Sequence, residues 1–229
     1  MNCKLCNSAT TDYKPMDFVR HTDWVKCASC GFEFVHPSPT QEWLDDYYAS
    51  NEYRIETHGE LDLSDGKPNI QNVHQEDDRA WQWFRYIPRG YKTMLDVGSG
   101  AGASIAAFQQ EYPDMYIEGV EPCTWGRLYD AYEKLEDAPG PYDVVTCFHV
   151  LEHVLDPLAF LAELSPLFTG QLCLETPIYP GSRAWPHMLN FSLDTLMLAM
   201  ELADMPAELC DDNYHIKIKV VRDEANPET

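Results

Sequence analysis

Short apolar segments alternate with segments of helical periodicity in the second half of the chain, and this alternation limits the fold more than any other feature. Apolar runs of strand length occupy residues 93–98, 115–122, 142–149 and 170–177, and helix-like segments follow them at 101–112, 124–135, 156–168 and 192–205. Such a pattern predicts βαβ units, in which helices cover both faces of a mostly parallel sheet. Two-residue alternation at 214–222 predicts one more strand. We therefore expect a doubly wound, Rossmann-like α/β fold.

The chain divides by composition into three parts. Residues 1–36 hold few apolar residues and many polar turns, and we expect them to form a small separate unit. Residues 37–74 read as a helical linker, with Thr40 as a helix N-cap and a loop at 55–74. Residues 75–229 make up the main domain.

The charge balance argues against nucleic acid as a partner. The chain of 229 residues carries 16 lysines and arginines against 38 acidic residues, a formal net charge of −22. Such a surface repels phosphate backbones, so bulk nucleic-acid binding is disfavoured. No apolar run approaches the ~18 residues of a membrane helix, and the first residues do not resemble a signal peptide. We expect a cytoplasmic protein with no membrane partner.

Four of the eight cysteines form two pairs near the N-terminus. Cys3 and Cys6 are separated by two residues, as are Cys27 and Cys30. In a chain without secretory features this spacing predicts a zinc site rather than disulfides. Four thiolates complete a tetrahedron and leave no open position for catalysis. We therefore expect one structural zinc ion in a zinc ribbon over residues 1–36.

A glycine-rich segment, GSGAGA at 98–103, follows the first strand of the main domain. It fits the G-x-G-x-x-A pattern of dinucleotide sites. Two features argue against a pyrophosphate: Asp96 lies just before the loop, and no lysine or arginine occurs from Thr93 to Gly126. S-adenosylmethionine has a ribose and positive charge but no phosphate. Asp96 could hold its ammonium side, and Glu121 could accept both ribose hydroxyls.

The runs LDVGSGAG, VEP, YDVVTCFHVLEHVLDP and GQLCLETP together resemble a class I S-adenosylmethionine-dependent methyltransferase of the type 11/23-like subgroup. The resemblance covers residues ~75–221. It implies a seven-stranded, mostly parallel sheet with a final antiparallel strand. It also implies a cofactor site that includes Asp96, Gly98, Gly100 and Glu121, with Pro122, Asp137 and Phe148 as further candidates.

One departure from the family pattern concerns the third strand. Only about 20 residues separate Glu121 from Tyr142, and the helix-like segment at 124–135 fills most of them. The third strand is therefore expected to be very short or absent.

The run HVLEH at 149–153 allows more than one interpretation. It matches H-x-x-E-H, an inverted zinc-protease motif, which predicts a zinc-dependent hydrolase using His149, Glu152 and His153. The methyltransferase family carries the same LEH run after its fourth strand. The histidines could equally pack or cap a turn. If the acceptor is a hydroxyl, a general base is needed, and the candidates are His149, His153 and His187.

The sequence as a whole predicts an S-adenosylmethionine-dependent methyltransferase with a structural zinc. Residues 27–50 resemble the linker after the zinc ribbon in one methyltransferase subgroup, which often accompanies sugar or secondary-metabolite pathways. The expected acceptor is a small molecule or a glycan-type group. An amino-methyltransferase of nucleic acids is disfavoured, because the fourth strand ends in CFHV rather than N/D-P-P-Y/F. The zinc hydrolase and a non-catalytic binding module remain alternatives.

Overall fold

A computed structural model of the chain describes residues 1–9, 18–19, 22–50, 79–123, 129–178, 186–213 and 215–222. The chain divides into two compact units. One comprises Met1–Pro39, Cys147–Pro166 and Cys173–Val221, and the other comprises Thr40–Thr146, Leu167–Leu172 and Arg222–Thr229. The predicted loop at 55–74 lies outside the described residues.

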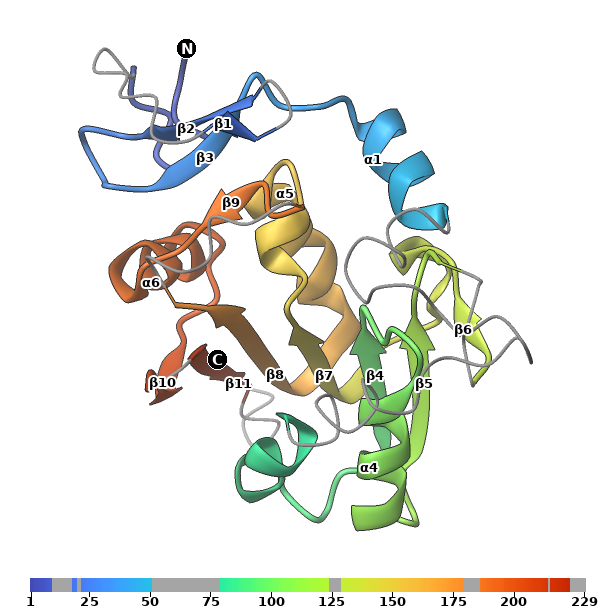
Figure 1. The fold of residues 1–229 in the computed structure, drawn as a ribbon. Coiled ribbons are helices and arrows are strands. Elements are labelled where there is room, and N and C mark those ends of the chain that lie inside the picture. The colour runs from blue at the N-terminus through green and yellow to red at the C-terminus, as the bar shows by residue number, and fades with distance from the viewer. Residues whose placement is uncertain are drawn as a thin grey trace. The chain divides into compact units, whose positions relative to one another are not determined.

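A seven-stranded sheet with the order β10-β11-β8-β7-β4-β5-β6 dominates the fold (Figure 1). Five of its strands coincide with the runs that the sequence marks as strands, and most residues of β4, β7, β8 and β11 are buried. The predicted Rossmann-like α/β class is therefore confirmed. The seven strands are β4 (Thr93–Val97), β5 (Tyr116–Val120), β6 (Ala131–Tyr132), β7 (Tyr142–Phe148), β8 (Phe168–Pro177), β10 (Glu208–Asp211) and β11 (His215–Val221).

Pairing within the sheet is parallel around the glycine loop. Strand β4 pairs in parallel with β5, and β5 pairs in parallel with β6. The amide of Asp143 donates to the hydroxyl of Thr93, and three residues further along both strands the hydroxyl of Thr146 donates to Asp96. Since both contacts join residues 50 positions apart, β4 and β7 also run in the same direction.

The last strand runs the other way. The amide of Arg222, just after β11, donates to the carbonyl of Gly170 near the start of β8. His215, at the start of β11, contacts Glu175 near the end of β8. These two contacts fit only an antiparallel arrangement, which is the final strand that the family resemblance implies. Strand β10 pairs antiparallel with β11 and was not predicted from the sequence.

The third strand of the main domain, β6, is two residues long, so the expectation of a very short strand is confirmed. The predicted helix at 124–135 is wrong in its second half, where β6 is followed by a 3-10 turn, η2 (Leu135–Asp137). Its first residues, 124–128, lie outside the described part of the chain.

Tyrosine side chains explain why a strand replaces the helix there. The hydroxyls of Tyr132 and Tyr142 donate to the carboxylate of Glu118 on β5, at 2.7 and 2.8 Å. The amide of Glu121 donates to the carbonyl of Tyr132 at 2.8 Å. These contacts join residues distant in sequence, and together they outweigh a local helical preference of tenths of a kcal/mol per residue.

Side-chain caps define where several helices begin. Thr40 caps α1 by accepting from the amide of Trp43, as the sequence predicts. Asp156 caps α5, and Ser192 caps α6 in a capping box with Thr195. The helices are α1 (Gln41–Ala49), α4 (Ala103–Glu111), α5 (Pro157–Leu164) and α6 (Leu193–Leu202), and the other 3-10 turns are η1 (Phe84–Tyr86), η3 (Leu151–His153) and η4 (Ser165–Leu167).

A second, four-stranded sheet has the order β1-β2-β3-β9, and its strands are β1 (Phe18–Val19), β2 (Thr22–Lys26), β3 (Glu33–His36) and β9 (Leu189–Asn190). The amide side chain of Asn190 donates to the buried carboxylate of Glu33 at 2.7 Å. Strand β9 thus joins the segment after β8 to the N-terminal strands. The sequence did not predict this pairing, because β9 is only two residues long.

Among the described residues, no helix combines the length and the apolar character needed to cross a membrane.

Candidate functional site

Three glycines shape the turn between β4 and α4. Gly98, Gly100 and Gly102 all have positive φ angles, of 73°, 56° and 93°. A residue with a side chain rarely adopts this backbone conformation, so the turn favours glycine at these positions. A Cβ at Gly102 would also lie 2.3 Å from the ring of Tyr129. The amides of Gly98 and Ser99 donate to the carbonyl of Val120, which ties the turn to the end of β5.

Glu121 reaches back to this turn from the end of β5. One oxygen of its buried carboxylate accepts from the amide of Gly100 at 2.9 Å. The other oxygen accepts from the amide of Cys123, also at 2.9 Å. Glu121 therefore holds the glycine turn in shape.

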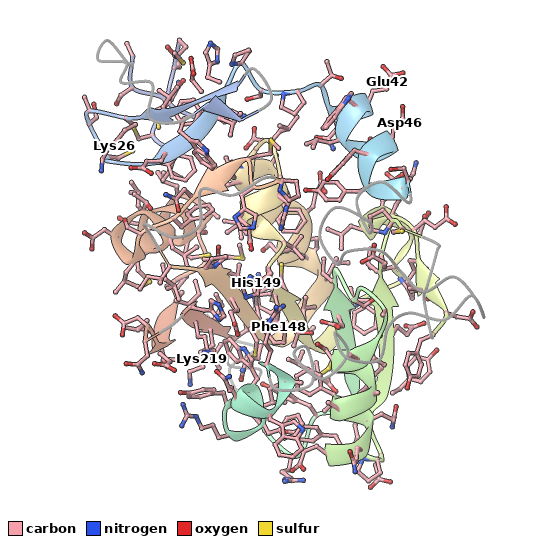
Figure 2. The ribbon with its side chains drawn as sticks, viewed as in Figure 1. Lys26, Glu42, Asp46, Phe148, His149 and Lys219 are labelled. Carbon is pink, nitrogen blue, oxygen red and sulfur yellow. The ribbon has the colours of Figure 1, made fainter. Side chains whose placement is uncertain are left out.

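Asp96 lies on β4, next to the turn. It is only 3% exposed, and one oxygen accepts from the hydroxyl of Thr146 at 2.7 Å. The sequence analysis did not select Thr146, although a threonine inside an apolar strand is a usable signal. Two other predicted cofactor residues, Pro122 and Asp137, are exposed. Phe148 is buried at the end of β7, beside His149 in the sequence (Figure 2).

The four N-terminal cysteines come together as the sequence predicts. The sulfurs of Cys3 and Cys30 lie 3.7 Å apart, and those of Cys6 and Cys27 are also 3.7 Å apart. All four lie within 4.8 Å of one another. A tetrahedral zinc ion with Zn–S bonds of about 2.3 Å places its sulfurs about 3.8 Å apart. The cluster therefore fits one zinc ion with four cysteine ligands.

The three predicted histidines, together with His215, form two pairs of packed rings. The ring of His153 packs edge-on against that of His187, with centroids 4.7 Å apart. The ring of His149 packs in the same way against His215, at 4.6 Å. His149 has a left-handed backbone with φ of 57°, which is uncommon for a residue with a side chain. Because η3 begins only at Leu151, these histidines are not displayed on one α-helix as a zinc-protease motif requires.

Two buried carboxylates lie among these rings. Glu175 on β8 is 0% exposed, and one of its oxygens lies 2.8 Å from Nδ1 of His215 and 3.3 Å from Nε2 of His149. Glu152 is 1% exposed, and its Oε1 lies 3.2 Å from Nδ1 of His149. Sequence reasoning missed Glu175 and His215. A glutamate inside a buried apolar run was the signal that could have found the first.

The surroundings shift the pKa values of Glu152 and His153 downward. Burial alone would raise the pKa of Glu152, but the close approach of His149 and the positive charge that the neighbouring histidines can carry outweigh burial and lower it to about 2. Burial lowers the pKa of His153 to about 4, although the negative charge of Glu152 opposes this shift. Glu152 is therefore a carboxylate and His153 a neutral imidazole near neutral pH.

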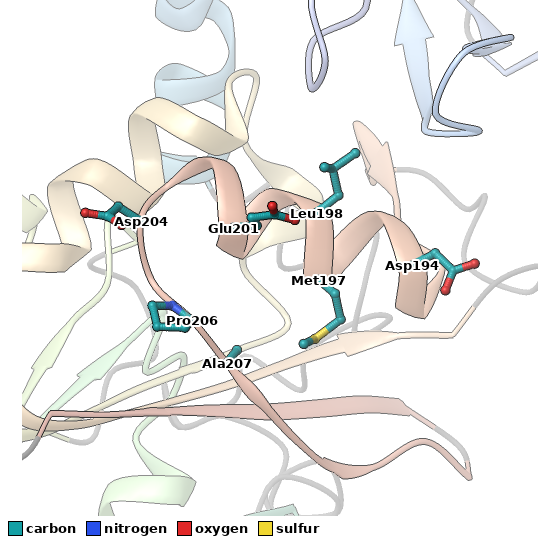
Figure 3. A pocket seen from close by; sticks show the side chains of 7 residues that line it. All are labelled: Asp194, Met197, Leu198, Glu201, Asp204, Pro206 and Ala207. Atoms are coloured by element: carbon teal, nitrogen blue, oxygen red, sulfur yellow. The ribbon is translucent and has the colours of Figure 1, made fainter.

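A separate hollow lies along α6 and the segment that follows it (Figure 3). Met197, Leu198, Pro206 and Ala207 give it apolar walls, and three acidic residues also line it. None of the predicted site residues belongs to this hollow. The acidic lining residues are Asp194, Glu201 and Asp204.

Comparison with known proteins identifies the family of the domain that contains the glycine turn. A sequence model of the methyltransferase domain family matches residues 62–213, more than half of the chain. The chain belongs to the methyltransferase domain family. The predicted resemblance is thereby confirmed, and the turn from Gly98 to Gly102 lies within the matched residues.

Individual relatives have low sequence identity to this chain. The ubiquinone biosynthesis O-methyltransferase of Aliivibrio fischeri (strain MJ11) is 27% identical over 146 residues, covering 57% of this chain and 58% of that protein. The protein of the same name from Colwellia psychrerythraea is 29% identical over 145 residues, covering 56% and 54%. This methyltransferase domain thus spans a little over half the length of these curated relatives. In fold, it is similar to the magnesium protoporphyrin IX methyltransferase of Synechocystis PCC 6803 with bound S-adenosylmethionine, with a TM-score of 0.54 and 16% identity, over 82% of this chain and 99% of that one.

Proposed function

We propose that this methyltransferase domain transfers a methyl group from S-adenosylmethionine to an oxygen of a small-molecule or glycan-type acceptor. The observation that carries the proposal is the arrangement of Glu121 on the glycine turn. The names of the ubiquinone biosynthesis O-methyltransferases favour an oxygen as the acceptor atom. A glycan-type acceptor rests on the linker resemblance alone.

The residues of the turn fit the cofactor. Gly98 and Gly100 project no side chain from the turn, so a ligand could approach the backbone there. Glu121 would accept the ribose hydroxyls, and Asp96 would hold the ammonium side, directly or through water. The absence of lysine and arginine from Thr93 to Gly126 favours a ligand without phosphate. Pro122, Asp137 and Phe148 stay predictions as further cofactor contacts.

The chain must supply positioning and a base. S-adenosylmethionine supplies a methyl group on a sulfonium, which is already a good leaving group, so orientation of the acceptor accounts for much of the rate. A hydroxyl acceptor must also lose its proton, and imidazole suits that role near neutral pH. With a pKa of about 4, His153 is a weak base. That low pKa counts against His153 as the base, and His149 and His187 stay predictions for this role.

We also propose that Cys3, Cys6, Cys27 and Cys30 hold one structural zinc ion. With four protein ligands the ion has no open position, so it stabilises the N-terminal strands and takes no part in methyl transfer.

Ligand-dependent melting tests the cofactor assignment. S-adenosylmethionine and its demethylated product should each raise the melting temperature, while NAD should not. Release of the demethylated product with a panel of hydroxylated aromatic compounds and sugars then tests turnover. Stabilisation by NAD alone would refute the cofactor assignment. Cofactor binding without turnover on any acceptor would favour the non-catalytic module.

A further inference from the structure

A cluster in one of the two units combines two partly exposed histidines and a buried carboxylate from distant parts of the chain. His149 follows β7, Glu175 lies on β8, and His215 begins β11. One ligand atom from each lies within 4.8 Å of the other two. The cluster shares no residue with the cysteine site or the glycine turn. The proposed methyl transfer does not require Glu175 or His215, and an ion bound to His149 would leave His187 as its base.

We propose that His149, Glu175 and His215 form a binding site for one divalent transition-metal ion, and that Glu152 orients His149. Two imidazole nitrogens and one carboxylate oxygen are a ligand set that suits manganese, iron, cobalt or zinc better than magnesium or calcium. Three protein ligands leave at least one position open for water or another molecule.

The two carboxylate–imidazole distances are close to those of such a site. Metal–nitrogen and metal–oxygen bonds of about 2.1 Å separate neighbouring ligand atoms by about 3.0 to 3.4 Å. Oε1 of Glu175 lies 2.8 Å from Nδ1 of His215 and 3.3 Å from Nε2 of His149. The two rings stand nearly perpendicular, at 87°, so both nitrogens can face one point beside Glu175.

Glu152 supplies an independent observation. Its Oε1 is buried and has no well-aligned hydrogen bond among the described residues, although Nδ1 of His149 lies 3.2 Å away. A histidine that binds a metal through one nitrogen usually donates the N–H of the other to a carboxylate. His149 has this arrangement, with Nε2 toward Glu175 and Nδ1 toward Glu152.

An ion is compatible with a neutral His149. A neutral imidazole has a single N–H and can donate to only one of the two carboxylates. Without an ion, Nδ1–H of His149 can donate to Glu152 while His215 faces Glu175. With an ion, the Nε2 lone pair binds the metal and Nδ1–H donates to Glu152, so a neutral ring satisfies both sides. The ion also balances the charges of two buried carboxylates.

Manganese binding to the full-length protein tests the proposal. Thiolates favour softer ions, so manganese leaves the cysteine site alone. Dialysed protein should take up one Mn²⁺ per chain, measured by loss of the electron paramagnetic resonance signal of free Mn²⁺. Pulsed resonance on the wild-type complex should detect two bound imidazole nitrogens. His215→Gln and Glu175→Gln should lose saturable binding, and Glu152→Gln should weaken it by about 10- to 100-fold.

His153→Gln is the matched control, because it removes a neighbouring histidine that the proposed site does not use. It should bind manganese as the wild type does. No saturable binding in the wild type would overturn the proposal and leave a hydrogen-bonded histidine cluster. Binding that His153→Gln abolishes and His215→Gln keeps would also overturn it, since the ion would then lie at Glu152, His153 and His187. The pulsed measurement needs no variant, so a poorly folding mutant does not remove the test.

Discussion

Glu121→Gln is the sharpest test of the cofactor site, because the structure gives this side chain two separable roles. Its carboxylate accepts from the amides of Gly100 and Cys123, both at 2.9 Å. The cofactor proposal adds ribose hydroxyls as further donors to the same two oxygens. Glutamine keeps the shape but replaces one acceptor oxygen with an NH2 group, which faces a donor.

The magnitude follows from these bonds. A hydrogen bond to a charged group contributes roughly 1.5 to 3 kcal/mol. Losing one backbone bond of Glu121 should therefore lower the free energy of unfolding by about that amount. Losing the charged acceptor for the ribose should weaken cofactor binding by ~10- to 100-fold, since about 1.4 kcal/mol corresponds to a factor of ten.

Calorimetric titration with the demethylated cofactor, paired with a melting curve, measures both effects on the same protein. Asp114→Asn is a suitable control, because it removes one negative charge from an exposed turn before β5. The control should keep wild-type affinity and stability. If Glu121→Gln is folded and destabilised but keeps wild-type affinity, the residue only supports the glycine turn and the ribose assignment is refuted.

Three further predictions follow from other parts of the chain. Purified protein should retain one tightly bound zinc ion, and Cys27→Ser should lose it without unfolding the main domain; elemental analysis showing no zinc in native protein would contradict this. Gly102→Ala should destabilise the fold, because its φ of 93° and the nearby ring of Tyr129 both exclude a Cβ; an unchanged melting temperature would count against this geometry. Since the folded pKa of His153 is about 4, below the usual 6.5, its contribution to stability is complete above pH 6.5 and is lost as pH falls toward 4. Denaturant titrations at several pH values in that range should show that His153→Gln loses less stability than the wild type as the pH falls. Parallel curves of stability against pH for the two proteins would contradict the assignment.

Local sequence patterns predicted the strands that carry the site, but not the pairings that complete it. The glycine-rich segment was recognised from its sequence alone, and Gly98, Gly100 and Gly102 all have positive φ angles in the turn after β4. The segment at 131–132 was misjudged because its strand depends on Glu118 and Tyr142, which lie at a distance in sequence. The partner of His149 was missed for the same reason. Glu175 and His215 meet only once β8 and β11 pair in one register, and no local pattern encodes that register.

The buried acids of the chain are compensated in different ways, and this difference separates the two proposed sites. Glu121 accepts from backbone amides, whose protons are fixed, so its charge is ready to meet hydroxyl donors of a ligand. Glu152 and Glu175 instead face imidazoles, whose protons can leave. Of these two kinds of partner, only the imidazoles can give up a proton and bind an ion through the nitrogen that is freed. A divalent cation should therefore bind at His149, and replacing His215 should remove it. The same replacement should leave the affinity of the glycine turn for the cofactor unchanged.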